Sequence, residues 1–202
     1  LKIKPFGYAN AGRVLALGAG VTKLEVGQRV ASIGAGYAQH SDYSVVPQNM
    51  VVPLPKNVKF EQGAYGMLLA TAMQAVRRAE PEIGQYTAVA GLGLVGQLTA
   101  RLFQLSGCYA IGWDTVTERI EQAKRLGIDE TALIGSEDEI EKTFSFTNGR
   151  GLDTSVIALG GNAEKPAHAL EKCMKVSGDG HPMGTMVVVG GAEFPFTRSL
   201  TN

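Results

Sequence analysis

The residues most able to do chemistry form one glycine-rich run at positions 91–96. The run follows an apolar segment, Thr87-Ala88-Val89-Ala90, and opens a helical pattern. In that context the first glycine permits a tight turn, the second lets the backbone approach a pyrophosphate, and the third lets helix and strand pack closely. Free amides at the helix N-terminus would bind the phosphates. The pattern predicts a dinucleotide site at Gly91, Leu92, Gly93, Leu94, Val95 and Gly96; the alternative is a packing loop in a fold without nucleotide.

An acid stands where the ribose of such a cofactor would be recognised. Asp114 ends the next strand-like segment, eighteen residues after Gly96. A carboxylate there would accept hydrogen bonds from the adenosine ribose and repel a 2′-phosphate, which favours NAD(H) over NADP(H). The alternative is a helix N-cap, because a helix is expected from Val116. Arg119 either shields the ribose edge or is an ordinary surface arginine.

The elements that must position these residues alternate between strand and helix from residue 85 onward. Such alternation is typical of an α/β fold with a parallel, doubly wound Rossmann sheet. The expected strands are Tyr86–Ala90, Tyr109–Trp113, Thr131–Ile134, Leu152–Ala158 and Thr185–Val189. The expected helices are Leu94–Ser106, Val116–Leu126, Glu137–Thr147 with Ser136 as N-cap, and Glu164–Val176.

The first third of the chain has a different texture. Glycine and proline separate short β-rich runs, which predicts a small barrel or sandwich. The runs are Val14–Leu17, Arg29–Ile33, Tyr43–Val46 and Met50–Pro53, and a period near 3.6 then predicts one helix over Phe60–Glu80. We expect a partial β-rich lobe over residues 1–66, a connecting helix over 67–84 and a nucleotide-binding domain over 85–202.

Composition narrows the classes of partner. Nineteen Lys and Arg balance nineteen Asp and Glu in 202 residues, so there is no basic surface for nucleic acid. No apolar stretch approaches the eighteen residues of a membrane helix. Cys108 and Cys173 lie far apart and no Cys/His cluster is present, which favours free thiols in a reducing, cytoplasmic setting over a disulfide or a structural zinc.

Several motifs occur in a characteristic order along the chain. They are Gly18-Ala19-Gly20-Val21-Thr22, Val26-Gly27-Gln28-Arg29-Val30-Ala31, Val52-Pro53-Leu54-Pro55, Thr71-Ala72 and the glycine run. This order resembles the medium-chain dehydrogenase/reductase superfamily, the zinc-type alcohol dehydrogenase-like group. The resemblance implies a GroES-like catalytic lobe beside a Rossmann domain, with NAD(P) in the cleft between them. It also implies hydride transfer to or from an alcohol or carbonyl carbon.

The resemblance assigns further residues by position. Thr71 resembles the threonine that approaches the nicotinamide, although a helical threonine can instead bond its own backbone. Two segments resemble those that line the cofactor after the fourth and fifth strands: Ala158, Leu159 and Gly160, and Val189, Gly190 and Gly191.

The chain departs from the zinc-dependent relatives at their ligands. They carry Gly-His-Glu where this chain reads Gly7-Tyr8-Ala9, and Cys or Asp where Met67 stands. A catalytic zinc needs about three protein ligands, so we expect none. The substrate oxygen then needs another proton donor or electrophile. The available side chains are Tyr8, Tyr37, Tyr65 and His40; Tyr8, at the position of the lost histidine, is the candidate, and a packing tyrosine is the alternative.

The chain also differs from the resembled family at its ends. A full sheet of this kind has six strands and five are expected here, so the chain resembles an enzyme cut at both sides. In the family the sixth strand commonly carries the dimer contact. Because that strand is not among the five expected here, a homodimer is a hypothesis. We expect an NAD(H)-dependent, zinc-independent oxidoreductase for a small-molecule substrate. The alternatives are a non-catalytic nucleotide-binding or interaction subunit, and a methyltransferase, which the β-rich lobe disfavours.

Overall fold

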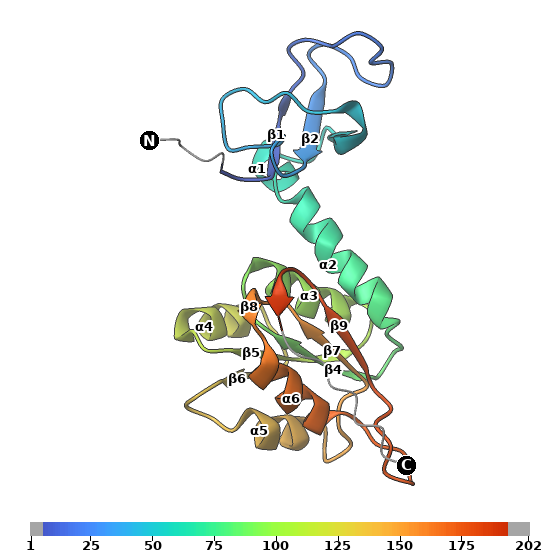
Figure 1. Ribbon diagram of the computed structural model, residues 1–202, viewed down its shortest axis with the longest axis vertical. Coiled ribbons are helices and arrows are strands. Elements are labelled where there is room, and N and C mark those ends of the chain that lie inside the picture. Colours follow the sequence, from blue (N-terminus) through green and yellow to red (C-terminus); the bar gives the residue numbers. More distant parts are fainter. Residues whose placement is uncertain (1–5, 194–202) are drawn as a thin grey trace. The chain divides into compact units, whose positions relative to one another are not determined.

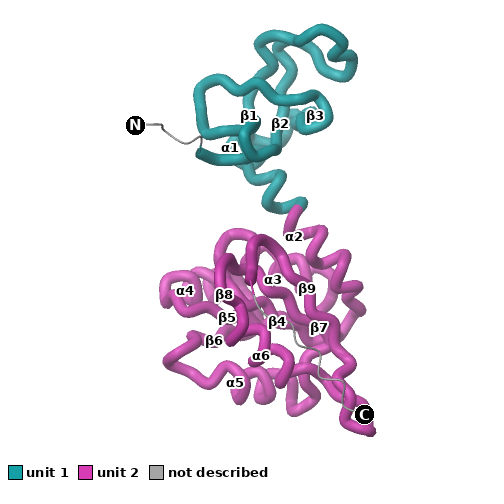
Figure 2. The backbone as a smooth tube through the Cα atoms, in the orientation of Figure 1, with its two compact units in different colours: residues 1–70 teal, residues 71–202 magenta. Residues whose placement is uncertain are grey.

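The chain forms two compact units. The computed structural model describes residues 6–193, and Figure 2 shows the division into unit 1, Leu1–Ala70, and unit 2, Thr71–Asn202. The border falls within helix α2 (Gly66–Ala79). Among the described residues, no helix is long and apolar enough to cross a membrane.

Unit 2 is built on a parallel five-stranded sheet of order β6-β5-β4-β7-β9 (Figure 1). Counted along the chain this is the order 3-2-1-4-5 of a Rossmann sheet. Its strands are β4 (Tyr86–Ala90), β5 (Tyr109–Asp114), β6 (Glu130–Leu133), β7 (Thr154–Ile157) and β9 (Thr185–Val188). The helices between them are α3 (Leu94–Leu105), α4 (Thr117–Arg125), α5 (Glu139–Phe146) and α6 (Glu164–Cys173). The predicted doubly wound fold is confirmed.

Both faces of this sheet are covered, which explains its continuous apolar strands. On one face, buried residues of α2, α3 and α4 pack with Val89 and Val156. On the other, buried residues of α6 pack with Ala88, Ile111 and Trp113, and α5 adds partly buried ones. Because side chains alternate along a strand, neighbours such as Ala88 and Val89 serve opposite faces. This double cover fixes the strand ends, and the loops after them, in place.

Unit 1 contains a smaller antiparallel sheet of order β1-β2-β3. Its strands are β1 (Ala9–Arg13), β2 (Arg29–Ile33) and β3 (Val51–Pro53), with the 3-10 turn η1 (Gln48–Met50) and helix α1 (Phe60–Gly63). The helix covers one face: the Arg29 guanidinium lies 4.6 Å from the Phe60 ring centroid. The antiparallel sheet agrees with the expected β-rich lobe.

Two predicted strands of unit 1 are wrong. Residues 14–17 form no strand. The ladder of β1 ends just before them at the Arg13–Arg29 pair, and beyond it the Val14 N–H donates to the Gln28 oxygen at 3.0 Å. Residues 43–46 also form no strand. The Asn10 amide donates to the Ser44 hydroxyl at 3.1 Å and so holds this segment by side chains, not by a ladder. A short apolar run forms a strand only when another segment pairs with it, and its composition does not show whether such a partner exists.

Helix boundaries differ from the expectation at two places. The single helix over Phe60–Glu80 is interrupted at residues 64–65, between α1 and α2. Gly63 allows this break to pack closely, because a Cβ there would lie 2.6 Å from Leu54 Cδ1. Ser136 is not a cap: the Asp138 carboxylate caps α5 and accepts from the amides of Ile140 and Glu141, each at 2.9 Å. An ionised acceptor suits the positive end of a helix.

Candidate functional site

The loops after four strands of unit 2 gather at one edge of the sheet, because parallel strands share their carboxyl ends. The Ala158 amide donates to the Ala90 oxygen at 2.8 Å, and the Gly161 amide to the Gly191 oxygen at 3.0 Å. A Cβ on Gly91 would lie 2.7 Å from the Ala158 oxygen. The structure therefore brings together the glycine loop and the predicted segments 158–160 and 189–191. An unpredicted two-stranded ladder, β8 (Gly161–Asn162) with β10 (Ala192–Glu193), follows these segments.

Two of the three loop glycines are demanded by the fold itself. Gly91 has a φ of +96°, in the left-handed region that favours glycine. A Cβ on Gly96 would lie 1.7 Å from the Gly91 oxygen, so only glycine allows α3 to approach β4 this closely. Gly93 differs, because nothing lies within 4 Å of a Cβ placed there. The second glycine thus leaves its backbone open on the side where a ligand would lie.

The start of α3 presents backbone amides. Gly93 is the N-cap, and no side chain caps this end. Within residues 6–193, no backbone or side-chain acceptor is found for the amides of Gly93, Leu94 and Val95. Such amides, together with the helix dipole, favour an anionic group. The loop therefore fits the pyrophosphate of a dinucleotide, both in its open backbone and in its donor set.

Asp114 ends β5 and is almost fully buried, with 4% of its surface exposed. Its Oδ2 accepts from the Leu92 amide at 2.7 Å, and its Oδ1 from the Val116 amide at 2.9 Å. The N-cap of α4 is Val116 itself, so the alternative reading of Asp114 as that cap is wrong. Arg119 Nη1 lies 3.3 Å from Oδ2. Arg119 is therefore paired with the predicted ribose acid, while half of its side chain remains exposed.

Sequence reasoning missed one residue of this site. Gln97, in the first turn of α3, is 8% exposed, and its Nε2 donates to the Leu92 oxygen at 2.7 Å. Leu92 is fully buried against Gly112, where a Cβ would lie 2.6 Å from Leu92 Cδ2. The signal available in the sequence was a polar side chain directly after Gly96, on a helix whose neighbours at that point are apolar.

The predicted catalytic residues lie in different units. Tyr8 precedes β1 in unit 1; it is exposed, and its carbonyl oxygen accepts from the Gly34 amide at 2.9 Å. The His40 ring packs directly against Gly7, since a Cβ on Gly7 would lie 2.2 Å from that ring. Thr71 is the first residue of unit 2 and is half-buried in α2. The roles of Tyr8 and Thr71 remain predictions.

The metal-ligating side chains are scattered. Across residues 6–193, no group of three or more His, Cys, Asp and Glu side chains could hold a metal ion. Cys108 and Cys173 are buried free thiols. Burial raises the pKa of the Cys173 thiol to about 11. Burial, and then the negative charge of Asp153, also raises the pKa of the Cys108 thiol. Both sulfurs are therefore neutral near pH 7.

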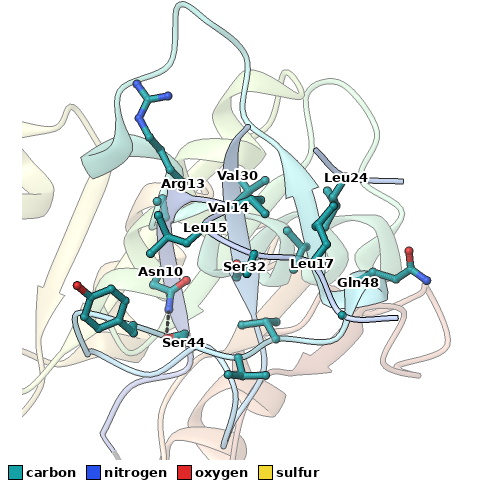
Figure 3. A pocket seen from close by; sticks show the side chains of 18 of the residues that line it. Asn10, Arg13, Val14, Leu15, Leu17, Leu24, Val30, Ser32, Ser44 and Gln48 are labelled. Carbon is teal, nitrogen blue, oxygen red and sulfur yellow. Dashed lines mark hydrogen bonds between the residues drawn. The ribbon is translucent and has the colours of Figure 1, made fainter. Parts of the chain in front are cut away.

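Unit 1 contains a hollow of about 390 Å³ (Figure 3). It lies over the sheet face that carries Asn10, Val30, Ser32 and Val51, and segments 14–18 and 41–46 border it. None of the residues predicted for the cofactor or for catalysis lines it. The hollow is lined by residues of unit 1 alone.

Comparison with known proteins agrees with the fold. A quinone oxidoreductase of Pseudomonas aeruginosa is 27% identical over 194 residues, covering 95% of this chain and 57% of that protein. D-xylulose reductase of Scheffersomyces stipitis is 26% identical, with 96% and 61% covered. The solved quinone oxidoreductase of Pseudomonas syringae pv. Tomato superposes with a TM-score of 0.75 at 26% identity, covering 92% of this chain and 55% of that one. No family model matches the chain.

These relatives are oxidoreductases of the medium-chain dehydrogenase/reductase superfamily. The chain is similar to them in sequence and shares their fold over more than nine tenths of its length. It spans little more than half the length of each of them.

Proposed function

We propose that the protein is an NAD(H)-dependent oxidoreductase that transfers a hydride between nicotinamide and an alcohol or carbonyl substrate. The observation that carries this proposal is the glycine loop. Packing requires glycine at Gly91 and Gly96, whereas nothing lies within 4 Å of a Cβ on Gly93, and the first amides of α3 have no acceptor among residues 6–193. Backbone amides without an internal acceptor at a helix N-terminus favour an anionic ligand. The similarity of the chain to oxidoreductases of the medium-chain dehydrogenase/reductase superfamily makes a dinucleotide the natural candidate.

The loops of unit 2 suggest a division of labour. Gly91–Gly96 and the start of α3 would bind the pyrophosphate, and Asp114 would face the adenosine ribose. The segments 158–160 and 189–191 would flank the nicotinamide, with Thr71 beside it. When bound, nicotinamide supplies the hydride acceptor or donor; the protein orients it and excludes water.

We propose NAD(H) as the preferred cofactor. The Asp114 carboxylate lies at the end of β5 and would repel a 2′-phosphate. Arg119 offsets part of this charge at 3.3 Å. A bare carboxylate would discriminate more strongly than this pair does. We therefore propose a moderate preference for NADH over NADPH.

We further propose that the reaction is zinc-independent, with Tyr8 as proton donor to the substrate oxygen. The support is the replacement of the usual histidine ligand by Tyr8, whose side chain is exposed and carries an ionisable hydroxyl. Conjugated carbonyls and quinones enter as substrate candidates, because a relative is a quinone oxidoreductase. The buried free thiols fit a reducing compartment such as the cytoplasm. The hypothesis of a homodimer is tested by measuring the molar mass in solution with light scattering.

The central test is a titration of the chain with NADH and NADPH, followed by nicotinamide fluorescence. We expect saturable binding of both, with NADH tighter; no saturable change, or tighter NADPH, contradicts the cofactor proposal. Turnover is then assayed with alcohols, aldehydes, enones and quinones. Binding without any turnover favours the non-catalytic alternative.

Two measurements address the chemistry. Tyr8→Phe should lower kcat while the Kd for NADH stays unchanged, because only the hydroxyl is lost; equal kcat values contradict the role of Tyr8. Elemental analysis should find no stoichiometric zinc. About one zinc per chain, lost together with activity on chelation, contradicts zinc independence.

A further inference from the structure

Leu92, the second residue of the glycine loop, has both of its backbone polar groups bound by buried side chains. Its amide donates to Asp114 Oδ2 at 2.7 Å, and its carbonyl oxygen accepts from Gln97 Nε2 at 2.7 Å. Asp114 comes from β5 and Gln97 from α3, so the loop is held from the strand and from the helix at once. Both polar side chains are nearly fully buried, where hydrogen bonds are strong and unpaired groups are costly.

A glycine loop needs such support more than other loops do. Gly91 and Gly93 have wide backbone freedom in the unfolded chain. A ligand that had to order them on binding would lose affinity, whereas a loop already ordered keeps it. Fixing the peptide groups on both sides of Leu92 determines the direction of the Gly93 amide. That amide is among those without an internal acceptor in the described part of the chain.

The carboxylate of Asp114 is largely occupied by this task. A carboxylate has about four acceptor positions, and the amides of Leu92 and Val116 and the Arg119 guanidinium use three of them. With 4% of the residue exposed, little of it remains for a ribose hydroxyl. Discriminating NADH from NADPH by its negative charge is therefore only part of what Asp114 does.

We propose that Asp114 and Gln97 are positioning residues that clamp Leu92 and preorganise the pyrophosphate loop. As a consequence, removing the Asp114 carboxylate weakens the binding of both NADH and NADPH, and it narrows the preference for NADH without tightening the binding of NADPH. This inference deepens the proposed function and rests on it. If Asp114 acted only by repelling the 2′-phosphate, the opposite result would be expected, since an uncharged residue at position 114 would then improve NADPH binding.

The first test needs no cofactor. Amide hydrogen exchange of Leu92 is measured by NMR in the cofactor-free chain, with amides of α5 as internal reference. Asp114→Ala should speed exchange at Leu92 at least about tenfold, because its acceptor is lost. Asp114→Asn keeps an acceptor oxygen and should speed it less; this second variant also covers the case in which Asp114→Ala does not fold. Unchanged exchange in Asp114→Asn and Asp114→Ala overturns the clamp.

The second test uses a protonatable substitute for Gln97. In Gln97→Glu, only the protonated carboxyl can donate to the Leu92 oxygen. The Kd for ADP-ribose should rise about tenfold or more at pH 8 and return toward the wild-type value as the pH falls to 5.5. The matched control is Gln104→Glu, since Gln104 also lies on α3 and donates to a carbonyl, that of Gly127, at 2.8 Å. It should leave the Kd and its pH dependence unchanged.

The outcomes separate this inference from the proposed function. Faster Leu92 exchange together with weaker NADH and NADPH binding in Asp114→Ala supports the clamp. Tighter NADPH binding in that variant, or a pH-independent Gln97→Glu, overturns it. A wild-type chain that binds neither cofactor refutes the proposed function, while the exchange measurement still decides whether Leu92 is clamped.

Discussion

The two units of the molecule differ in how completely their own side chains fill them. In unit 2 the centre of the sheet is closed to solvent, because Val89, Ile111 and Trp113 are fully buried, as is Phe103 of α3. Among residues 6–70, the hydrophobic side chains that are buried are those of Val30, Ala31 and Ala38. Unit 1 instead holds a hollow of about 390 Å³. Protein interiors normally leave few voids larger than a water molecule.

The same difference appears in the use of glycine. Gly112 in β5 is required by its surroundings, because Leu92 fills the space of its missing side chain. Gly12 in β1 has nothing within 4 Å of a Cβ. In these two strands, Gly112 thus marks close packing and Gly12 faces open space. The proposed cofactor site lies in unit 2, whose central sheet residues are fully buried.

The largest expected effect tests the packing contrast directly. Phe103→Ala should lower the free energy of unfolding of unit 2 by about 3–5 kcal/mol, since it removes a fully buried ring and leaves a cavity. Val30→Ala, at the hollow, should cost only about 1–2 kcal/mol, because a cavity already exists there. Urea unfolding measures both, with Trp113, the single tryptophan, reporting on unit 2 and circular dichroism on the whole chain. Equal losses contradict the contrast.

A pair of loop variants separates packing from ligand access. Gly96→Ala should destabilise unit 2 by about 1–3 kcal/mol and abolish tight NADH binding, because its Cβ collides with the Gly91 oxygen. Gly93→Ala should leave thermal stability within about 0.5 kcal/mol of wild type and still weaken NADH binding, since the methyl group occupies the open side of the loop. Thermal unfolding and NADH titration distinguish them. A destabilised Gly93→Ala contradicts the open-loop geometry.

Two strand glycines sharpen the comparison between the units. Gly112→Ala should cost about 1 kcal/mol or more, because the buried Leu92 side chain has to move. Gly12→Ala should change stability by no more than about 0.5 kcal/mol, as nothing meets the added methyl group. Matched urea titrations of the two variants measure this. The comparison fails if Gly12→Ala is the more damaging of the two.

The last expected effect concerns the burial of the Cys173 thiol in unit 2. Burial raises the pKa of Cys173 from 9.0 to about 11, so the folded state favours the neutral thiol. The resulting stability is complete below about pH 9 and is lost as pH rises through 11. By pH 10 the loss should be about 1 kcal/mol relative to pH 8. The difference in unfolding free energy between wild type and Cys173→Ala isolates this contribution from other titrating groups. A pH-independent difference means that the thiol is hydrated.

Prediction from sequence succeeded where a pattern is local and repeated. The strands and helices of unit 2 lie within about two residues of most expected bounds, because each has enough periodic residues to specify its type. The strand prediction failed over residues 14–17 and 43–46, where short apolar runs lack a partner. Pairing is decided by segments distant in the sequence, and composition does not report it.

The sequence by itself determined the Rossmann order of elements and the glycine loop, because glycine's positive φ and close approach are properties of single residues in their local context. It also located Asp114 at the end of β5. Only the tertiary structure decided what that carboxylate touches. Leu92 lies 22 residues away along the chain and meets Asp114 because β4 and β5 are neighbours in the sheet. Gln97 completes the arrangement from α3. A hydrogen bond between distant segments depends on which strands lie side by side, and that is fixed only when the whole sheet folds.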